Sequence, residues 1–340
     1  MSIPTNKYFI LYASCIPVKG HKRSVLCDLQ RDDFVFIPND LYGILTEHRT
    51  KSVDELKLYY NNGCNTEIDE YFDFLLKNEY GFWNDNLEEF PLLDLYWDRP
   101  SVITNAIIDV DESSDHDYNS IFAQLEKLGC GDIQLRFYDS VELRELERIL
   151  THLESRRIKS VEMIIKDSAE LTNELLIGLC NSFGRLFMIY VHSCAEDKLI
   201  YKGLEGIGRI VGMTQKIDNN SHCGVISPIF FSISLDTFTE AQKHNSCLNR
   251  KISIDINGDI KNCPTFERNY GNVRQTSLQS VVSQREFKAL WDVNRDLIEI
   301  CKDCEFRYIC TDCRAFSVNA GTPYSKPVKC NYNPYTAVWE

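Results

Sequence analysis

Hydrophobic and polar residues in the first quarter of the chain follow a pattern that predicts three strands and then three helices. The predicted strands are rich in β-branched and aromatic residues and cover residues 7–18, 23–29 and 33–38. The predicted helices carry apolar residues three and four positions apart and cover residues 41–49, 53–60 and 66–80. We expect Asn39 or Asp40 to cap the first helix and Ser52 the second. This order predicts a small winged-helix-like domain over residues 1–84.

A different pattern follows a linker at residues 85–100, which prolines punctuate. Between residues 101 and 246, apolar strand-like runs alternate with helical patterns, which favours an α/β fold with a parallel sheet. The predicted strands cover residues 102–110, 133–138, 160–166, 185–192, 208–214 and 228–234. Six such strands fit a degenerate partial (β/α)6 TIM-like barrel, and the pattern by itself does not exclude a doubly wound sheet.

Periodicity weakens from about residue 247, where cysteines become frequent. Residues 251–264 predict a β-hairpin that turns at Asn257 and Gly258. Residues 278–294 predict a helix. The remainder of this region is expected to be loop arranged around bound metal.

Composition narrows the function. The chain has 340 residues and a formal net charge of −13, which argues against nucleic-acid binding through clustered Lys and Arg. No apolar run is long enough to cross a bilayer, and the N-terminus lacks the pattern of a signal peptide. We therefore expect a cytoplasmic protein with no membrane partner, in a compartment where thiols stay reduced.

The 14 cysteines are distributed unevenly. Those in the first 223 residues are scattered and are expected to be small buried apolar residues. The rest crowd into the C-terminal region, at Cys247, Cys263, Cys301, Cys304, Cys310, Cys313 and Cys330. Close C-x2-C pairs are typical of a metal clamp, and their spacing alone does not distinguish zinc from iron–sulfur clusters.

The cysteine order C-x10-G-x4-C, C-x2-C-x5-C-x2-C and a final C resembles the SPASM domain of radical-SAM peptide-maturing enzymes. It departs from that pattern in the last pair, where two residues replace three. The resemblance implies two four-iron–four-sulfur (4Fe–4S) clusters. It assigns Cys301, Cys304, Cys310 and Cys330 to one cluster, and Cys247, Cys263 and Cys313 to the other. Two fully ligated clusters need one more thiolate than these seven residues supply. The cluster at Cys247 therefore has an open iron or takes a further ligand, for which His244 is our expectation and Cys223 the alternative.

Radical-SAM enzymes carry C-x3-C-x2-C after the first barrel strand and a Gly-Gly-Glu-type turn after the second. Here the loop after the first predicted strand, residues 111–120, contains no cysteine. The second predicted strand is followed by no glycine turn. We therefore do not expect S-adenosylmethionine as a cofactor or an active radical-SAM enzyme. The replacing loop is acidic, which is typical either of a Mg2+ or acid–base site or of a capped helix start. Its acidic residues are Asp109, Asp111, Glu112, Asp115 and Asp117.

Three strands followed by three helices, attached to such a cysteine pattern, are similar to the recognition element with which peptide-maturing enzymes hold a leader peptide. The resemblance implies that the leader adds as a strand to the third strand and lies against the third helix. By position this assigns Phe34, Val35, Phe36, Tyr71, Leu75 and Asn78 to peptide binding. Core packing is the alternative interpretation of each residue.

Taken whole, the chain resembles the SPASM proteins of grasp-with-SPASM systems, which are encoded beside an ATP-grasp ligase and a precursor peptide. The resemblance divides it into a leader-recognition domain (1–84), a linker (85–100), a degenerate radical-SAM-like barrel (101–246) and a SPASM domain (247–340). It implies a maturation factor for a ribosomally made peptide that binds the leader and presents the precursor to the ligase. An iron–sulfur redox enzyme that modifies the peptide, or a zinc-stabilised interaction protein, are the alternatives.

Overall fold

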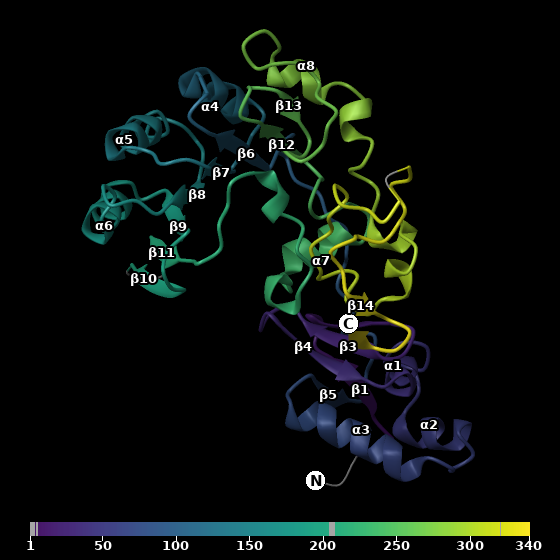
Figure 1. The fold of residues 1–340 in the computed structure, drawn as a ribbon. Helices are drawn as coiled ribbons and strands as arrows, with labels where there is room; N and C mark the ends of the chain where they lie inside the picture. The colour runs from purple at the N-terminus through teal and green to yellow at the C-terminus, as the bar shows by residue number, and fades with distance from the viewer. Residues whose placement is uncertain (1–3, 5, 204–207, 320) are drawn as a thin grey trace. The chain divides into compact units, whose positions relative to one another are not determined.

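The computed structural model describes residues 4, 6–203, 208–319 and 321–340 (Figure 1). The chain forms two compact units, each assembled from separate stretches of sequence. Unit 1 takes Met1–Asp98, Val225–Ser246 and Val293–Glu340. Unit 2 takes Arg99–Gly224 and Cys247–Asp292. The cysteine-rich region, expected as one domain, is thus divided between the two units.

The N-terminal part of unit 1 contains an antiparallel sheet in the order β2 (Cys15–Val18), β3 (Ser24–Asp28), β4 (Asp33–Ile37). It continues into α1 (Asn39–Leu45), α2 (Val53–Tyr59) and α3 (Asn65–Lys77). The first predicted strand is broken by a turn in which the Cys15 N–H donates to the Tyr12 carbonyl at 2.8 Å. Its first half, β1 (Tyr8–Leu11), instead pairs with β5 (Gly81–Asn84), a strand that the pattern did not predict.

Local side-chain chemistry fixes the helix starts in this domain. The predicted Ser52 cap is confirmed, because its Oγ accepts from the Glu55 N–H and the Glu55 carboxylate accepts from the Ser52 N–H at 2.8 Å. The predicted cap at Asn39 or Asp40 is wrong, since Pro38 precedes α1 and Asn39 is its first residue. The Asn39 side chain is used elsewhere, where its Oδ1 accepts from Ser24 Oγ at 2.7 Å.

The rest of unit 1 is short of regular structure. It contains α7 (Leu235–Ala241), the pair β14 (Tyr332–Asn333) and β15 (Val338–Trp339), and single-turn helices at Pro228–Phe230, Arg295–Leu297 and Cys301–Asp303. The predicted strand at 228–234 is wrong, because Pro228 opens a single helical turn there. A small apolar core around Phe238, Phe306 and Tyr332 holds these segments to β2 and β3 through Val18 and Val25.

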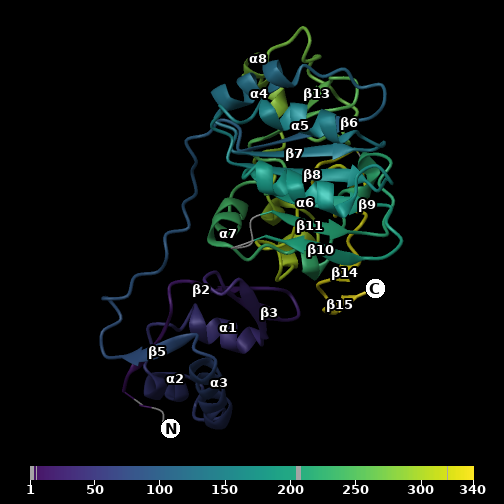
Figure 2. The same ribbon diagram turned by 90° about the vertical axis from the view of Figure 1, so that its left-hand side faces the viewer.

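Unit 2 is built on an eight-stranded sheet (Figures 1 and 2). The order is β10 (Lys198–Lys202), β11 (Arg209–Gly212), β9 (Leu186–His192), β8 (Ser160–Lys166), β7 (Asp132–Phe137), β6 (Asn105–Val110), β12 (Lys251–Ile254) and β13 (Ile260–Lys261). The six strands from β11 to β12 run parallel, and β10 and β13 are antiparallel edges. The predicted parallel α/β sheet is confirmed, with β12 as its sixth strand in place of residues 228–234.

Helices cover one face of this sheet: α4 (Tyr118–Lys127), α5 (Leu143–Thr151), α6 (Asn173–Ser182) and α8 (Leu278–Val282) (Figure 2). The predicted helix at 278–294 ends after α8, and a separate turn follows at Glu286–Lys288. The main apolar core lies between these helices and the sheet. None of the helices in the described part of the chain is long and apolar enough to cross a membrane.

The opposite face of the sheet is polar although it is buried. Strand side chains alternate between faces, so the neighbours of the core residues Ile108, Leu135 and Val191 point away from the helices. These neighbours are Asp109, Arg136 and His192, none of which is more than 1% exposed. The predicted hairpin β12–β13 is also confirmed, and Gly258 adopts the positive φ of 85° that its turn requires.

Candidate metal centre

The C-terminal cysteines fall into two groups, one in each unit. Cys301, Cys304, Cys310, Cys313 and Cys330 belong to unit 1, and Cys247 and Cys263 belong to unit 2.

Four thiols of unit 1 lie close enough to affect one another electrostatically. The pKa of Cys301 is raised to about 11 and that of Cys310 to about 12, mainly by burial and with smaller contributions from the charges of neighbouring thiolates. The segment that carries them is folded by its own backbone, as the Cys304 N–H donates to the Cys301 carbonyl at 3.0 Å. The four, Cys301, Cys304, Cys310 and Cys330, are the residues that the resemblance assigns to one cluster.

A buried excess of positive charge accompanies these thiols. Arg295 and Arg314 flank Asp312, with N–O distances of 3.7 and 3.0 Å, and the three side chains are at most 4% exposed. Arg295 Nη1 donates to the Cys310 carbonyl at 2.7 Å. In the described chain, Nη2 of both arginines has no hydrogen-bond acceptor. Two guanidinium groups against one carboxylate fit an anionic metal–thiolate group, which would balance the second charge.

The unit 2 thiols also have a cation beside them, the half-buried Lys251. Lys251 Nζ lies 3.6 Å from Cys247 Sγ. Burial alone would lower the pKa of Lys251, but the thiolate charges of Cys247 and Cys263 more than offset this, so its pKa is raised. Burial raises the pKa of Cys263 to about 12. Cys247 and Cys263, with Lys251 beside them, therefore also form a donor set suited to an anionic cluster.

The two remaining predicted ligands belong to unit 1. Cys313 is buried there, one residue from Asp312. His244 follows α7, where its N–H donates to the Glu240 carbonyl at 2.9 Å and its ring lies 5.5 Å from that of Trp97. Of the two candidates for the further ligand of the Cys247 group, Cys223 and not His244 belongs to the same unit as Cys247 and Cys263.

The donors in both groups are soft thiol sulfurs. Among the described residues, no three His, Cys, Asp or Glu side chains are arranged to hold a metal ion. Soft thiolates without imidazole or carboxylate suit iron–sulfur clusters, and binding has to displace the protons that burial now favours. The predicted ligands were visible as cysteines, whereas the cations Lys251, Arg295 and Arg136 were missed. Only Arg136 left a signal in the sequence, as a charged residue inside an apolar run.

The acidic loop after β6 has structural roles. Asp109 holds Arg136 through two hydrogen bonds, at 2.6 and 2.8 Å. Asp117 caps α4 by accepting from the Ser120 N–H at 3.0 Å. Asp111 accepts from the side chains of Ser113 and Ser114. Of the two interpretations of this loop, these contacts support the capped helix start.

The residues assigned to peptide binding have different environments. Phe34 and Phe36 stack against Phe306, with ring centroids 5.5 and 5.8 Å apart, and Phe36 remains 42% exposed. Val35 and Tyr71 pack at the border of the helical core. Leu75 is wholly buried in that core, so its side chain is out of reach of a ligand. Asn78 is exposed, and its carbonyl accepts from Arg31 Nη1 at 3.0 Å.

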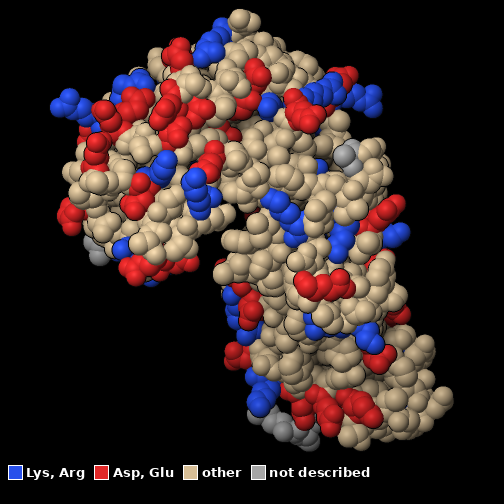
Figure 3. Space-filling view, in the orientation of Figure 1, with Lys and Arg blue, Asp and Glu red and all other residues tan. Residues whose placement is uncertain are grey.

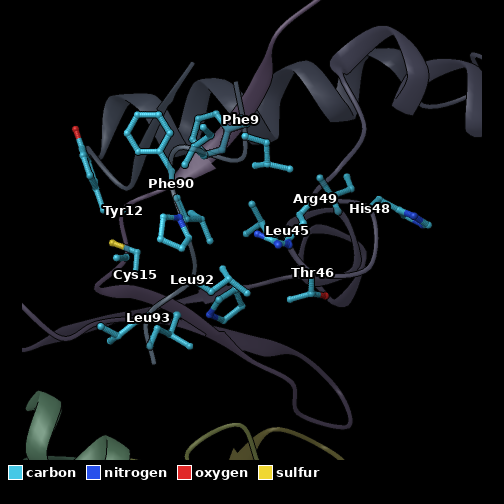
Figure 4. Close-up of a pocket in the computed structure, with 18 of the residues that line it drawn as sticks. Phe9, Tyr12, Cys15, Leu45, Thr46, His48, Arg49, Phe90, Leu92 and Leu93 are labelled. Atoms are coloured by element: carbon cyan, nitrogen blue, oxygen red, sulfur yellow. The ribbon is translucent and has the colours of Figure 1, made fainter. Parts of the chain in front are cut away.

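A cavity of about 280 Å³ lies in the same domain (Figure 4). Its walls are mostly apolar and include Phe9, Cys15 and Leu45 from the domain itself. Phe90 and Leu92, from the predicted linker, close it on another side. The linker therefore packs on unit 1, to which residues up to Asp98 belong.

Comparison with known proteins supports the metal-binding assignment for part of the chain. Residues 246–305 match the model of the SPASM family, described as an iron–sulfur cluster-binding domain. No curated protein matches the chain. Two crystal structures of Streptococcus suis SuiB align with 12% identity, one bound to S-adenosylmethionine and one to the precursor peptide SuiA. They cover 96% and 95% of this chain and 98% of SuiB, with TM-scores of 0.39 and 0.40. The segment that holds Cys247, Cys263, Cys301 and Cys304 is therefore similar to an iron–sulfur cluster-binding domain.

Proposed function

We propose that this chain is a cytoplasmic maturation factor for a ribosomally made peptide, with two 4Fe–4S clusters in its cysteine-rich region. It binds the leader of the precursor and presents the rest to a partner ATP-grasp ligase. The observation that carries the proposal is the pair of thiol groups, each with at least one cation beside it, in and next to the segment that matches an iron–sulfur domain. Cys301, Cys304, Cys310 and Cys330 hold one cluster, and Cys247, Cys263 and Cys313 contribute to the other.

Metal analysis tests the first half of this proposal. We expect protein purified without oxygen to be brown and to contain about eight irons and about eight sulfides per chain, as two four-iron clusters require. The measurement is iron, zinc and acid-labile sulfide content against protein concentration. Stoichiometric zinc without sulfide would instead identify the zinc-stabilised interaction protein.

The second half rests on the open edge of β4. Within the described residues β4 pairs only with β3, so its other edge is free to accept a peptide strand. The Phe34 N–H donates to Oδ1 of the adjacent residue Asp33 at 2.8 Å. This N–H therefore points away from β3. Because backbone donors alternate along a strand, the Phe36 N–H points to the same free edge.

The charge of α3 bears on the kind of partner this domain accepts. Arg31, in the β3–β4 turn, ties the end of α3 to the start of β4 through the Asn78 and Glu79 carbonyls. Glu67, Glu70 and Asp73 lie exposed on α3, in an acidic patch at the lower end of Figure 3. Such a surface repels phosphate, which favours a peptide over a nucleic acid as the partner.

Replacing Phe36 with proline should weaken leader binding more than replacing it with alanine. Both variants lose the exposed ring, but only Phe36→Pro removes the outward N–H, and proline is tolerated at an edge strand. Since one hydrogen bond contributes ~1 kcal/mol, we expect Phe36→Pro to bind about fivefold more weakly than Phe36→Ala. The measurement is fluorescence anisotropy with the labelled precursor leader, after circular dichroism shows both variants to be folded. Equal affinities would exclude strand addition at this edge.

A redox enzyme is the second candidate, and the buried polar face of the sheet favours it. Asp109, Arg136 and His192 there are unusual in a purely structural sheet. This function requires that the protein and a reductant change the mass of the precursor without the ligase. If the mass of the precursor does not change under anaerobic conditions with both clusters intact, the redox function is excluded and the presentation role remains.

A further inference from the structure

We propose that Cys223 is a metal ligand, which joins Cys247 and Cys263 in holding the iron–sulfur cluster of unit 2. The inference rests on the proposed iron–sulfur function and adds to it a residue outside the segment 246–305 that matches the SPASM family. It also replaces His244, the ligand expected from the sequence.

The first observation is that the chain segment bearing Cys223 is fastened to the segment bearing Cys263. The short helical turn Asn220–His222 ends at Cys223. Asn220 Nδ2 donates to the Pro264 carbonyl at 3.0 Å, and Thr265 Oγ1 donates to the Asn220 carbonyl at 3.4 Å. Both contacts fall within two residues of Cys263. The two segments that carry these thiols are therefore held together by side-chain hydrogen bonds within one unit.

The second observation is that two of these sulfurs each lie beside a cation. Lys251 Nζ lies 3.6 Å from Cys247 Sγ. Arg136 Nη1 lies 3.4 Å from Cys223 Sγ, while its other two nitrogens are held by Asp109. Three thiols with a lysine and an arginine directed at their sulfurs form the environment of a thiolate-bound anionic cluster, in which hydrogen bonds to sulfur tune the metal.

The other cysteines of unit 2 show what a merely structural thiol looks like here. Cys130 and Cys180 are buried in the main apolar core. Cys194 packs at the edge of that core, and its Sγ donates to the Val191 carbonyl at 3.2 Å. Among the described residues, no hydrogen bond joins the sulfur of any of these three to a Lys or Arg side chain, whereas Arg136 Nη1 lies at hydrogen-bonding distance from Cys223 Sγ. Its surroundings differ from those of a space-filling residue.

Anaerobic iron and sulfide analysis of Cys223→Ala, with electron paramagnetic resonance of the reduced protein, tests the proposal. Loss of one ligand releases either one iron or the whole cluster, so we expect iron to fall from about eight to between about four and about seven per chain. The signal of one cluster should change and that of the other should not. Cys194→Ala is the matched thiol control, and His222→Ala disturbs the same segment without removing the thiol; both should keep the full iron content.

Footprinting of the unmodified protein gives a readout that needs no variant. Iodoacetamide should leave Cys223 unlabelled in the cluster-loaded protein and label it after chelation, while the exposed Cys64 reacts in both states. Full iron content and unchanged signals in Cys223→Ala, or labelling of Cys223 in the loaded protein, would overturn the proposal. If the wild-type protein holds zinc in place of iron, the proposed function fails, and loss of zinc in Cys223→Ala would still establish the ligand.

Discussion

Replacing Asp109 with asparagine should lower the free energy of unfolding of unit 2 by about 3–5 kcal/mol. The carboxylate accepts two hydrogen bonds from Arg136, and both side chains are at most 1% exposed. An amide of the same shape leaves the guanidinium charged and uncompensated on the inner face of the sheet. Hydrogen-exchange mass spectrometry of β6 and β7 peptides in increasing urea measures the change for this unit separately from unit 1.

Two further variants separate charge burial from general damage. Glu145→Gln removes a carboxylate from an exposed pair with Arg148 on α5, where the expected change is at most ~0.5 kcal/mol. Asp109→Leu combined with Arg136→Met removes both charges and should recover most of the lost stability. If Asp109→Asn proved as mild as Glu145→Gln, the pair would not be a stabilising element of the sheet.

Replacing Cys310 with alanine should remove about half of the bound iron, from about eight to about four per chain. The thiol is one of four in unit 1, and the part of the chain from Val293 onward has only two-residue strands and single helical turns around it. A structural metal site can contribute ~10 kcal/mol to folding, which is more than such short elements supply. We therefore expect this region also to become sensitive to limited proteolysis.

The control for this variant is Cys64→Ala. Cys64 is an exposed thiol of the same unit that precedes α3 and makes no capping hydrogen bond there, so its removal should leave iron and protease resistance unchanged. Retention of about eight irons by Cys310→Ala would show that this thiol is not a ligand and that the grouping of the unit 1 cysteines has to be revised.

Local sequence predicted the elements well wherever their signal was itself local. The alternation of strands and helices between β6 and β9 follows from periodicity, because each amphipathic helix buries its apolar face on the sheet next to it. The Ser52 cap and the Asn257–Gly258 turn depend on residues at most three positions apart. The metal-binding character of the C-terminal region followed from cysteine spacing in the same way.

Predictions that depended on distant partners were less successful. β5 was missed because its four residues gain strand geometry only by pairing with β1, some seventy positions earlier. Residues 228–234 have the composition of a strand but form a turn, and β12 takes the sixth parallel place beside β6. Strand composition reports burial, whereas the neighbour that completes a sheet is selected by the whole topology.

The sequence by itself determined that this chain has a parallel α/β sheet and a C-terminal region with closely spaced cysteine pairs, since both are encoded in short-range spacing. Only the tertiary structure decided how the thiols are grouped and which charges accompany them. Cys223 is anchored beside Cys263, forty residues later, by hydrogen bonds of Asn220, and Arg136 reaches it from another strand. The sequence does not show which residue pairs with a charged side chain inside an apolar strand, because the fold decides which strands lie side by side.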